Sequence, residues 1–244
     1  MPNQFGMFAT NAEFATIAGL PVIEIRRTPL DGWGRIVKRL FDVFGALLGM
    51  IVLSPVYLVI AIISKLTDPG PVFYSHKRVS RSGTPIQVYK FRTMTYKWSP
   101  RPGYKYTTAE EALIGMGRPD LVEEFKKSQK LENDPRVNAF GRFLRRSSLD
   151  ELPQLFNVLR GDLSLVGPRP VVEAELERYG DQAAAFLSLK PGITGMWQVS
   201  GRSDIGYDER VKLDIYYVEN WSLLLDIQIL IKTLLIILRG RGAY

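Results

Sequence analysis

The chain has 244 residues, enough for one sizeable domain or a domain with an anchor, and its 46% apolar and 23% charged residues exclude a disordered protein. It has no cysteine, which excludes disulfides, cysteine-ligated metals and thiol nucleophiles. The net charge of +7 predicts an anionic partner: nucleic acid, an anionic membrane surface or a phosphorylated substrate.

The first apolar segment follows a polar stretch over 1–35 and is long enough to cross a membrane. Residues 43–64 carry no charged side chain, and a helix of that length would be about 33 Å long. Ser54 and Pro55 lie near its middle, where proline predicts a kink because it removes a backbone N–H. Basic residues flank both ends, so the positive-inside rule assigns no orientation. These features favour a re-entrant membrane helix over 36–66, with a kinked spanning helix as the alternative.

A mixed helix and strand body is predicted over residues 67–220. Residues 70–94 carry β-branched and aromatic residues on both sides of Ser82-Gly83, which predicts two strands joined by a turn. Residues 96–120 show no clear period and predict a loop. Apolar spacing predicts helices over 119–131, 139–161, 171–180 and 207–221. The expected fold class is α/β, a helix-rich α+β domain with a small sheet.

Asp150 and Glu151 are adjacent at the apparent start of a helix. In one interpretation Ser148 and Glu151 form a capping box, and both carboxylates only stabilise the helix end. Pro153 is best placed in the first helical turn, which would leave the two acids in the entering turn. There an ionised carboxylate can attack a phosphoryl group while its neighbour holds Mg²⁺. The residues alone leave both interpretations open.

Arginines next to prolines and glycines form the second group of candidates, since the chain contains no GxSxG, HExxH or P-loop pattern. Arg169 lies between Pro168 and Pro170, and a fixed backbone would pre-position its guanidinium for phosphate. A tight structural turn is the alternative. Arg202 ends a similar glycine-rich loop. Further positive charge comes from Lys90, Arg92, Arg145 and Arg146.

The second apolar segment closes the chain over 221–244. Asp226 and Lys232 interrupt it, which makes it too polar to span a membrane comfortably. We expect an amphipathic helix in the membrane interface, with Trp221 at the boundary. A buried helix that packs on the globular domain is the alternative.

Five blocks carry a resemblance to a known family: KRLFDVFGALLGMIVLSP, YKFRTM, DPRVNAFGRFLRRSSLDELPQLFNVLRGDLSLVGPRP, KPGITGMWQVSGR and YYVENWSLLLDI. Together they resemble the bacterial sugar transferases, the monotopic polyprenyl-phosphate sugar-1-phosphate transferases, over roughly residues 36–244. The SLDELPQ and GPRP blocks in this order are highly specific. The GPRPVVE continuation and the short tail resemble the members that begin exopolysaccharide synthesis with galactose or glucose.

The resemblance implies a monotopic protein of the bacterial cytoplasmic (inner) membrane, with a re-entrant helix broken at Ser54-Pro55 and a catalytic domain on the cytoplasmic face. It implies transfer of a hexose-1-phosphate from a UDP-hexose to undecaprenyl phosphate, with UMP released. In this family the position of Asp150 is the nucleophile that carries a covalent phospho-sugar, and that of Glu151 helps to bind Mg²⁺. The expected substrate-binding residues are Lys90, Arg92, Arg145, Arg169 and Arg202.

The expected partners are the UDP-hexose, undecaprenyl phosphate and inner-membrane lipids, with a homo-oligomer and other polysaccharide-assembly proteins as further candidates. Three alternatives stay open. The transfer could be direct, with both carboxylates holding metal. The chain could be a non-catalytic membrane scaffold of a polysaccharide assembly complex. Nucleic-acid binding through the +7 charge is disfavoured, because membrane and phosphate ligands already account for the basic residues.

Overall fold

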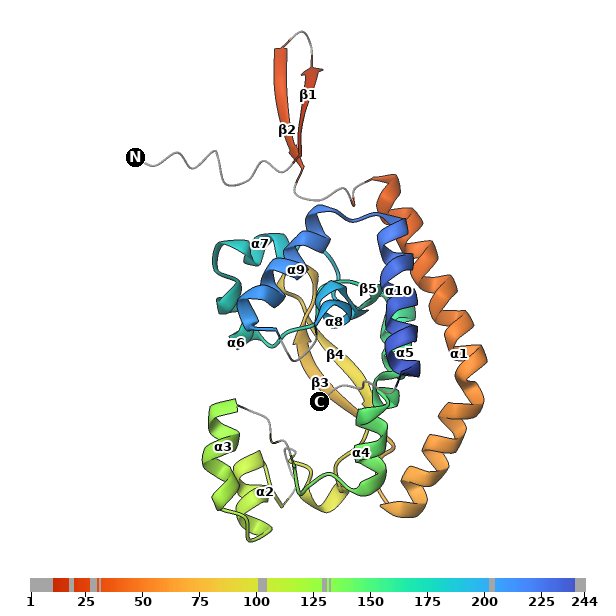
Figure 1. Cartoon of the computed structure of the whole chain (residues 1–244), viewed down its shortest axis with the longest axis vertical. Coiled ribbons are helices and arrows are strands. Elements are labelled where there is room, and N and C mark those ends of the chain that lie inside the picture. Colours follow the sequence, from red (N-terminus) through yellow and green to blue (C-terminus); the bar gives the residue numbers. More distant parts are fainter. Residues whose placement is uncertain are drawn as a thin grey trace. The chain divides into compact units, whose positions relative to one another are not determined.

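The computed structural model describes residues 11–17, 20–26, 30, 32–100, 105–128, 131, 133–201 and 205–239 (Figure 1). The chain divides into two compact units. The first unit comprises Met1–Ile51, His76–Val88 and Gln154–Leu238, and the second comprises Val52–Ser75, Tyr89–Pro153 and Arg239–Tyr244. The division into 1–35, 36–66, 67–220 and 221–244 made from the sequence stays a prediction.

An antiparallel hairpin lies within the segment that the sequence marked only as polar. Its strands are β1 (Asn11–Ile17) and β2 (Leu20–Arg26), and they pair from Asn11 opposite Arg26 to Ile17 opposite Leu20. The sequence analysis did not predict these strands.

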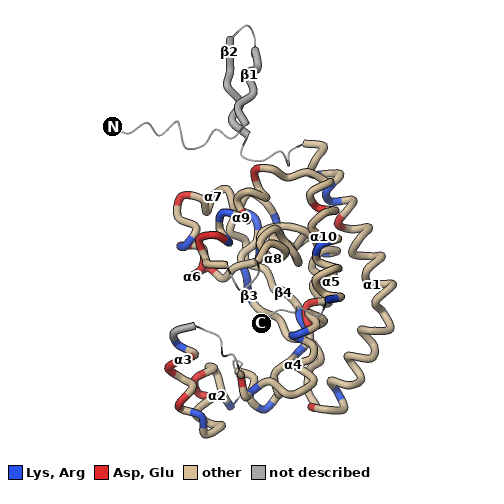
Figure 2. The backbone as a smooth tube through the Cα atoms, in the orientation of Figure 1, with Lys and Arg blue, Asp and Glu red and all other residues tan. Residues whose placement is uncertain are grey.

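The long helix α1 (Trp33–Thr67) contains the first apolar segment. Its most apolar window has a mean hydropathy of 2.6, and only 11% of that window is buried, which argues against a core helix of a soluble protein. Charged residues lie at both ends of α1 and are absent from its middle (Figure 2). By length and composition α1 could therefore cross a membrane. The helix continues through Pro55, so the re-entrant course and the bend at Ser54-Pro55 stay predictions.

Small residues on one face of α1 allow it to pack closely within the first unit. A Cβ added at Gly45 would lie 2.6 Å from Leu165 Cδ1, and one added at Gly49 would lie 3.2 Å from Leu155 Cδ1. Ala46, on the same face, is fully buried. The larger apolar side chains of α1 stay exposed, among them Trp33, Leu40, Phe44, Ile51, Leu58 and Leu66.

The first unit has a short parallel sheet of β5 (Ser164–Val166) and β6 (Gly192–Thr194), and helices pack around it. Its main apolar cluster includes Val158, Leu163, Val166 and Ile229. The helices of this unit are α5 (Gln154–Arg160), α6 (Glu173–Leu176), α7 (Ala183–Phe186), α8 (Met196–Ser200), α9 (Tyr207–Glu219) and α10 (Leu223–Leu238). A 3₁₀ segment follows α6 over Glu177–Gln182. The predicted helices over 171–180 and 207–221 are therefore confirmed, the first as a short α-helix followed by 3₁₀ turns.

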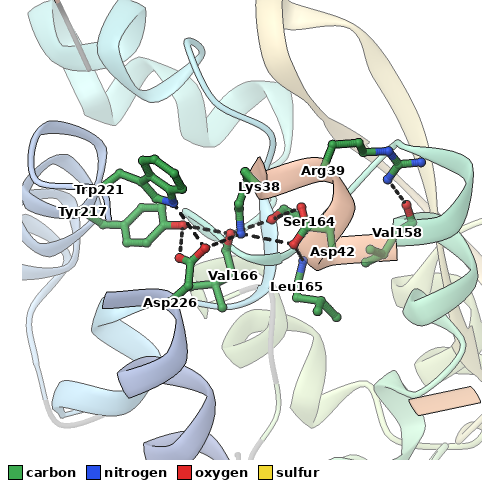
Figure 3. Close-up of polar contacts among 10 residues, drawn as sticks. All are labelled: Lys38, Arg39, Asp42, Val158, Ser164, Leu165, Val166, Tyr217, Trp221 and Asp226. Atoms are coloured by element: carbon green, nitrogen blue, oxygen red, sulfur yellow. Dashed lines mark hydrogen bonds and ion pairs between the residues drawn. The ribbon is translucent and has the colours of Figure 1, made fainter. Parts of the chain in front are cut away.

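A buried polar network fixes the first turns of α1 to α10 (Figure 3). Lys38 Nζ lies 2.8 Å from Asp226 Oδ2 and 3.2 Å from Asp42 Oδ1. Asp42 also accepts hydrogen bonds from the Ser164 hydroxyl at 2.8 Å and from the Leu165 N–H at 3.0 Å. The network therefore joins α1, β5 and α10 through groups that are almost fully buried.

Asp226 has a different role from the one expected for it. Its carboxylate lies 2.7 Å from the Tyr217 hydroxyl and accepts a 3.2 Å hydrogen bond from Trp221 Nε1. Asp226 is fully buried, whereas α10 exposes large apolar side chains on other faces, Leu224, Ile231, Leu234 and Leu238 among them. Asp226 interrupts the apolar sequence of α10, but its carboxylate points into the protein and pairs with Lys38. The helix packs on the unit and also has an exposed apolar face, so its position in an interface stays a prediction.

A two-stranded sheet confirms the strand-turn-strand prediction. β3 (Phe73–Val79) and β4 (Pro85–Phe91) are joined by a 3₁₀ turn over Arg81–Gly83. Ser82 has φ 60° and Gly83 has φ 77°, both left-handed, which suits a tight reversal at these small residues.

In the second unit the last turns of α1 pack against β4, α4 and the 3₁₀ turn that follows α4. Ile60, Phe91 and Leu144 form its buried apolar cluster. The predicted helix over 119–131 is present as α3 (Asp120–Ser128). The prediction of a loop over 96–120 is wrong in part, because a 3₁₀ turn (Tyr96–Trp98) and α2 (Ala109–Gly115) lie within it. Thr108 and Glu111 form a capping box at the start of α2, a signal that was present in the sequence.

Candidate active site

The turn that carries Asp150 and Glu151 interrupts the helix predicted over 139–161. α4 (Ala139–Arg146) ends before it, and a 3₁₀ turn (Leu149–Glu151) follows. Ser148 has φ 56° and makes no side-chain capping hydrogen bond. The capping-box interpretation of Ser148 and Glu151 is therefore wrong, and the two acids lie in the entering turn. An irregular turn of this kind lets adjacent side chains face one site, which a regular helix does not.

Lys90 connects the two carboxylates. Its ammonium donates a 2.6 Å hydrogen bond to Glu151 Oε1 and lies 3.9 Å from Asp150 Oδ2. β4 supplies the lysine, and the 3₁₀ turn supplies both acids. Asp150 is buried, whereas Glu151 and Lys90 are partly exposed, so a ligand can reach the pair from the side of Lys90.

Arg145 lies in the same unit and is held by Thr93. Its Nε donates a 2.9 Å hydrogen bond to Thr93 Oγ1. Gly141 allows this approach, because a Cβ at that position would lie 2.0 Å from the Thr93 carbonyl oxygen. Asn138 caps α4 by accepting a 2.6 Å hydrogen bond from the Gly141 N–H. α4 is therefore fixed against Thr93, two residues after β4, with Arg145 in its last turn.

The surroundings of Asp150 raise the pKa of its carboxyl group toward neutral pH. Burial raises the pKa of the Asp150 carboxyl to about 6, the positive charges of Lys90 and Arg145 oppose this rise, and the charge of Glu151 adds to it. Burial lowers the pKa of the Arg145 guanidinium, which nonetheless stays charged near neutral pH. Near pH 7 Asp150 is therefore mostly an ionised, poorly solvated carboxylate, a state that favours nucleophilic attack.

Arg92 has internal partners for its whole side chain. It donates to the carbonyl oxygens of Pro71 at 2.7 Å and Asp68 at 2.6 Å, and it forms an ion pair with the Asp68 carboxylate. Only 8% of Arg92 is exposed. These contacts do not support the expectation that Arg92 binds substrate, and we assign it a structural role in linking the end of α1 to the residues after β4.

The pair Asp150 and Glu151 fits a Mg²⁺ ion of the kind found in phosphoryl-transfer sites. Among the residues that the structure describes, no group of three or more acidic or histidine side chains could hold a metal. Mg²⁺ in such sites is commonly bound by one or two protein carboxylates, with water and substrate phosphate completing the shell. The two carboxylates already converge on one cation, the Lys90 ammonium.

Arg169 belongs to the first unit, where it lies in a cluster with Trp197, Arg210 and Asp214. Only Arg169 of this cluster was predicted as a site residue from the sequence. The guanidinium carbons of Arg169 and Arg210 lie 5.6 Å and 4.8 Å from the Trp197 ring centroid. Burial raises the pKa of Asp214 to about 7, against hydrogen bonds from the Tyr179 hydroxyl and the Arg169 N–H. The Arg169 backbone is therefore held by a hydrogen bond to the buried Asp214 carboxylate. The other predicted phosphate ligand of this loop region, Arg202, lies outside the described residues.

A small cavity of about 30 Å³ lies within this cluster. Asp214 Oδ1 and Arg210 Nε are buried and have no hydrogen-bond partner of their own. The cavity has room for about one water, which would satisfy both atoms. Two features of the sequence could have predicted this cluster. Trp197 lies within a glycine-rich block, and Arg210 and Asp214 lie four residues apart on one helix.

The chain is similar to known proteins over most of its length. Residues 33–240 match the family model for the bacterial sugar transferases. The chain is 44% identical to the undecaprenyl-phosphate galactose phosphotransferase of Salmonella typhimurium, over 98% of this chain and 48% of that protein. It is 45% identical to the exopolysaccharide production protein ExoY of Rhizobium meliloti, over 86% of this chain and 89% of ExoY.

A third relative is the UDP-glucose:undecaprenyl-phosphate glucose-1-phosphate transferase of Escherichia coli, 35% identical over 100% of this chain and 49% of that protein. The chain thus spans about half the length of the Salmonella and Escherichia relatives and most of ExoY. With the family model matched over most of its length, the chain belongs to the bacterial sugar transferase family.

Proposed function

We propose that this chain transfers a hexose-1-phosphate, galactose or glucose, from a UDP-hexose to undecaprenyl phosphate and releases UMP. This would be the first membrane step of exopolysaccharide synthesis. The names of the relatives support the substrates, since they include a galactose phosphotransferase, a glucose-1-phosphate transferase and an exopolysaccharide production protein. The observation that carries the proposal is the contact of Lys90 with both the buried Asp150 and the partly exposed Glu151 of one turn.

In the first step Asp150 attacks the phosphorus that carries the hexose. A bond forms between Asp150 Oδ and this phosphorus, and the bond from the phosphorus to the bridging oxygen of the diphosphate breaks. UMP leaves with that oxygen and its electron pair, and the hexose-1-phosphate remains on Asp150 as an acyl phosphate. Lys90 is placed to bind the negative phosphate oxygens, and Arg145 adds a second positive charge close to Asp150.

In the second step an oxygen of undecaprenyl phosphate attacks the same phosphorus. The bond to Asp150 breaks, the carboxylate is restored, and the product is an undecaprenyl diphosphate hexose. No net proton transfer is required in either step. Glu151 would hold Mg²⁺, whose charge would offset that of the diphosphate oxygens.

The proposed substrates require an enzyme at a membrane surface, because the UDP-hexose is soluble and undecaprenyl phosphate is a lipid. The Tyr57 hydroxyl of α1 donates a hydrogen bond to the carbonyl of Leu152, the residue after Glu151. Within the second unit the reactive turn is therefore tied to the apolar helix α1. We place the enzyme at the cytoplasmic face of the inner membrane, where UDP-hexoses are available, with α1 re-entering at Ser54-Pro55.

Exchange of labelled UMP into UDP-hexose, measured without any lipid, tests the proposal and the covalent route together. The two-step route predicts exchange that Asp150→Asn abolishes and that the same change at the exposed Asp208 leaves intact. Lipid product formed without any exchange would favour direct transfer to the lipid phosphate. Full cellular function of both Asp150→Asn and Arg169→Ala would favour a non-catalytic scaffold.

A further inference from the structure

A second cavity, in the unit that does not contain Asp150, is lined by an excess of positive charge. Its volume is about 220 Å³, and it lies beside the first turns of α1. The lining cations come from α1, from the turn between β3 and β4, and from the residue before Pro191. They are Arg35, Lys38, Arg39, Arg81 and Lys190.

The residues that line the cavity carry more positive than negative charge. Asp42 is the one carboxylate among the described residues that line the cavity, and it already pairs with Lys38. Arg39 donates to the neutral carbonyl oxygens of Val158 at 2.6 Å and Leu159 at 2.7 Å. These bonds orient its guanidinium at the C-terminal end of α5.

Lys190 and Arg39, which both line the cavity, also both approach Gly161. Lys190 Nζ lies 3.4 Å, and the Arg39 guanidinium 3.5 Å, from the position that a Cβ would occupy on Gly161. Burial lowers the pKa of Lys190, and the charges of Arg39 and Arg81 add to this effect. Like charges that line one cavity favour a bound anion, because partly buried cations are costly without a counter-charge.

The surroundings of the cavity suit an anion presented at a membrane surface. Trp33 is 80% exposed at the start of α1, and Leu40 is 65% exposed two turns later. The neighbouring helix α10 exposes Leu224 and Leu234. Apolar side chains for acyl chains and cations for a headgroup are thus combined in one unit.

We propose that the cavity lined by Arg35, Arg39, Arg81 and Lys190 binds a phosphate group at the membrane surface. The phosphate can come from the headgroup of an anionic lipid or from free phosphate in solution, since the same cations would recognise both. This site is independent of the transfer reaction proposed above and does not use Asp150 or Glu151.

Binding to the purified full chain in non-ionic detergent tests the proposal. Native mass spectrometry would measure retention of phosphatidylglycerol, with phosphatidylcholine as the uncharged comparison, and equilibrium dialysis would measure labelled inorganic phosphate. We expect Lys190→Gln to weaken binding of the true ligand at least about tenfold. Arg81→Gln, a change at an exposed turn residue, should do the same without disturbing the fold. The matched control is Lys212→Gln, which removes an exposed lysine from the same unit.

The outcomes separate the two sources. Selective loss of phosphatidylglycerol in the Lys190 and Arg81 variants supports a lipid headgroup, and selective loss of inorganic phosphate supports a soluble ligand. Equal affinities of wild type and both variants for both ligands would overturn the proposal. So would an equal loss in Lys212→Gln, which would show that only the net charge matters.

Discussion

Lys90 donates a 2.6 Å hydrogen bond to Glu151, and the same ammonium lies 3.9 Å from Asp150. The lysine side chain is 34% exposed, whereas the Asp150 side chain is 12% exposed. In the proposed reaction, an incoming phosphate would meet the Lys90 ammonium first and the buried Asp150 carboxylate behind it. β4 and the irregular turn beside it therefore place Lys90 nearer to solvent than Asp150, which suits the proposed phosphoryl transfer.

Removal of the Lys90 charge should impair catalysis in a pH-dependent way. In Lys90→Gln we expect kcat/KM for UMP release to fall at least about tenfold, because a charge-assisted contact to phosphate is lost. The acid limb of the pH profile should also move to higher pH, because Lys90 lowers the pKa of Asp150. Initial rates from about pH 5 to 9 measure both effects. Lys126→Gln, a change on α3, is the control, and a tenfold loss with an unmoved acid limb would contradict the electrostatic role.

The burial that would make the Asp150 carboxylate reactive should also lower the free energy of unfolding of the protein. Its folded pKa, about 6, lies above the ordinary aspartate value of 3.8, so the native state binds the proton more tightly. The stabilisation from this group is fully present below pH 3.8 and is lost as the pH rises through about 6. Asp150→Asn should therefore raise the free energy of unfolding by roughly 2–3 kcal/mol at neutral pH.

Denaturant unfolding of wild type and Asp150→Asn at several pH values checks this difference, which should shrink steadily toward pH 4. Asp208→Asn, a change at an exposed acid, should show no such trend. A variant less stable than wild type at neutral pH would show that the Asp150 charge is stabilised rather than strained.

The buried Lys38–Asp226 ion pair should be a major contributor to the attachment of α1 to α10. Lys38→Met leaves both Asp42 and Asp226 without their cation, and we expect destabilisation by about 3–5 kcal/mol. Asp226→Asn should have a smaller effect, because Lys38 keeps Asp42 and the amide oxygen can still accept from Tyr217. Denaturation in detergent micelles, followed by circular dichroism, gives this ranking. Lys212→Met, which breaks an exposed pair, should cause no measurable change, and an equal effect of Lys38→Met and Lys212→Met would exclude a structural role for the network.

Arg92 and Arg145 were both predicted to bind substrate, but substitutions at the two positions should have different effects on kinetics and stability. Arg92→Ala should lower stability, since its partners Asp68 and Pro71 lose their donor, while the folded fraction keeps the wild-type KM for UDP-hexose. Arg145→Ala should instead raise KM or lower kcat with a smaller effect on unfolding. Parallel kinetics and melting curves distinguish the two. A raised KM in folded Arg92→Ala would restore its predicted role in substrate binding.

Local sequence patterns predicted the elements whose cause is local. The β-branched and aromatic residues around Ser82-Gly83 predicted β3 and β4, and apolar spacing predicted α3 and α9. The break between α4 and α5 was harder to predict, because the left-handed conformation of Ser148 is set by its surroundings and not by its residue type.

Contacts between distant parts of the chain explain what the sequence did not predict. Asp226 looked like a polar interruption because its cation, Lys38, lies near the other end of the chain. Arg92 looked like a phosphate ligand because its partner Asp68 lies before the strand hairpin. The pairing of Lys90 with the two acids was expected only from the resemblance, since no local spacing relates β4 to the turn at Asp150.

The most direct test of the covalent route is the intact mass of the purified, lipid-free protein after incubation with Mg²⁺ and a UDP-hexose. The account predicts a gain equal to one hexose phosphate, absent in Asp150→Asn and present in Asp208→Asn. The sugar that gives the fastest gain would identify the donor. No mass gain with any UDP-hexose, while UMP and lipid product still form once undecaprenyl phosphate is added, would contradict the assignment of Asp150 as nucleophile.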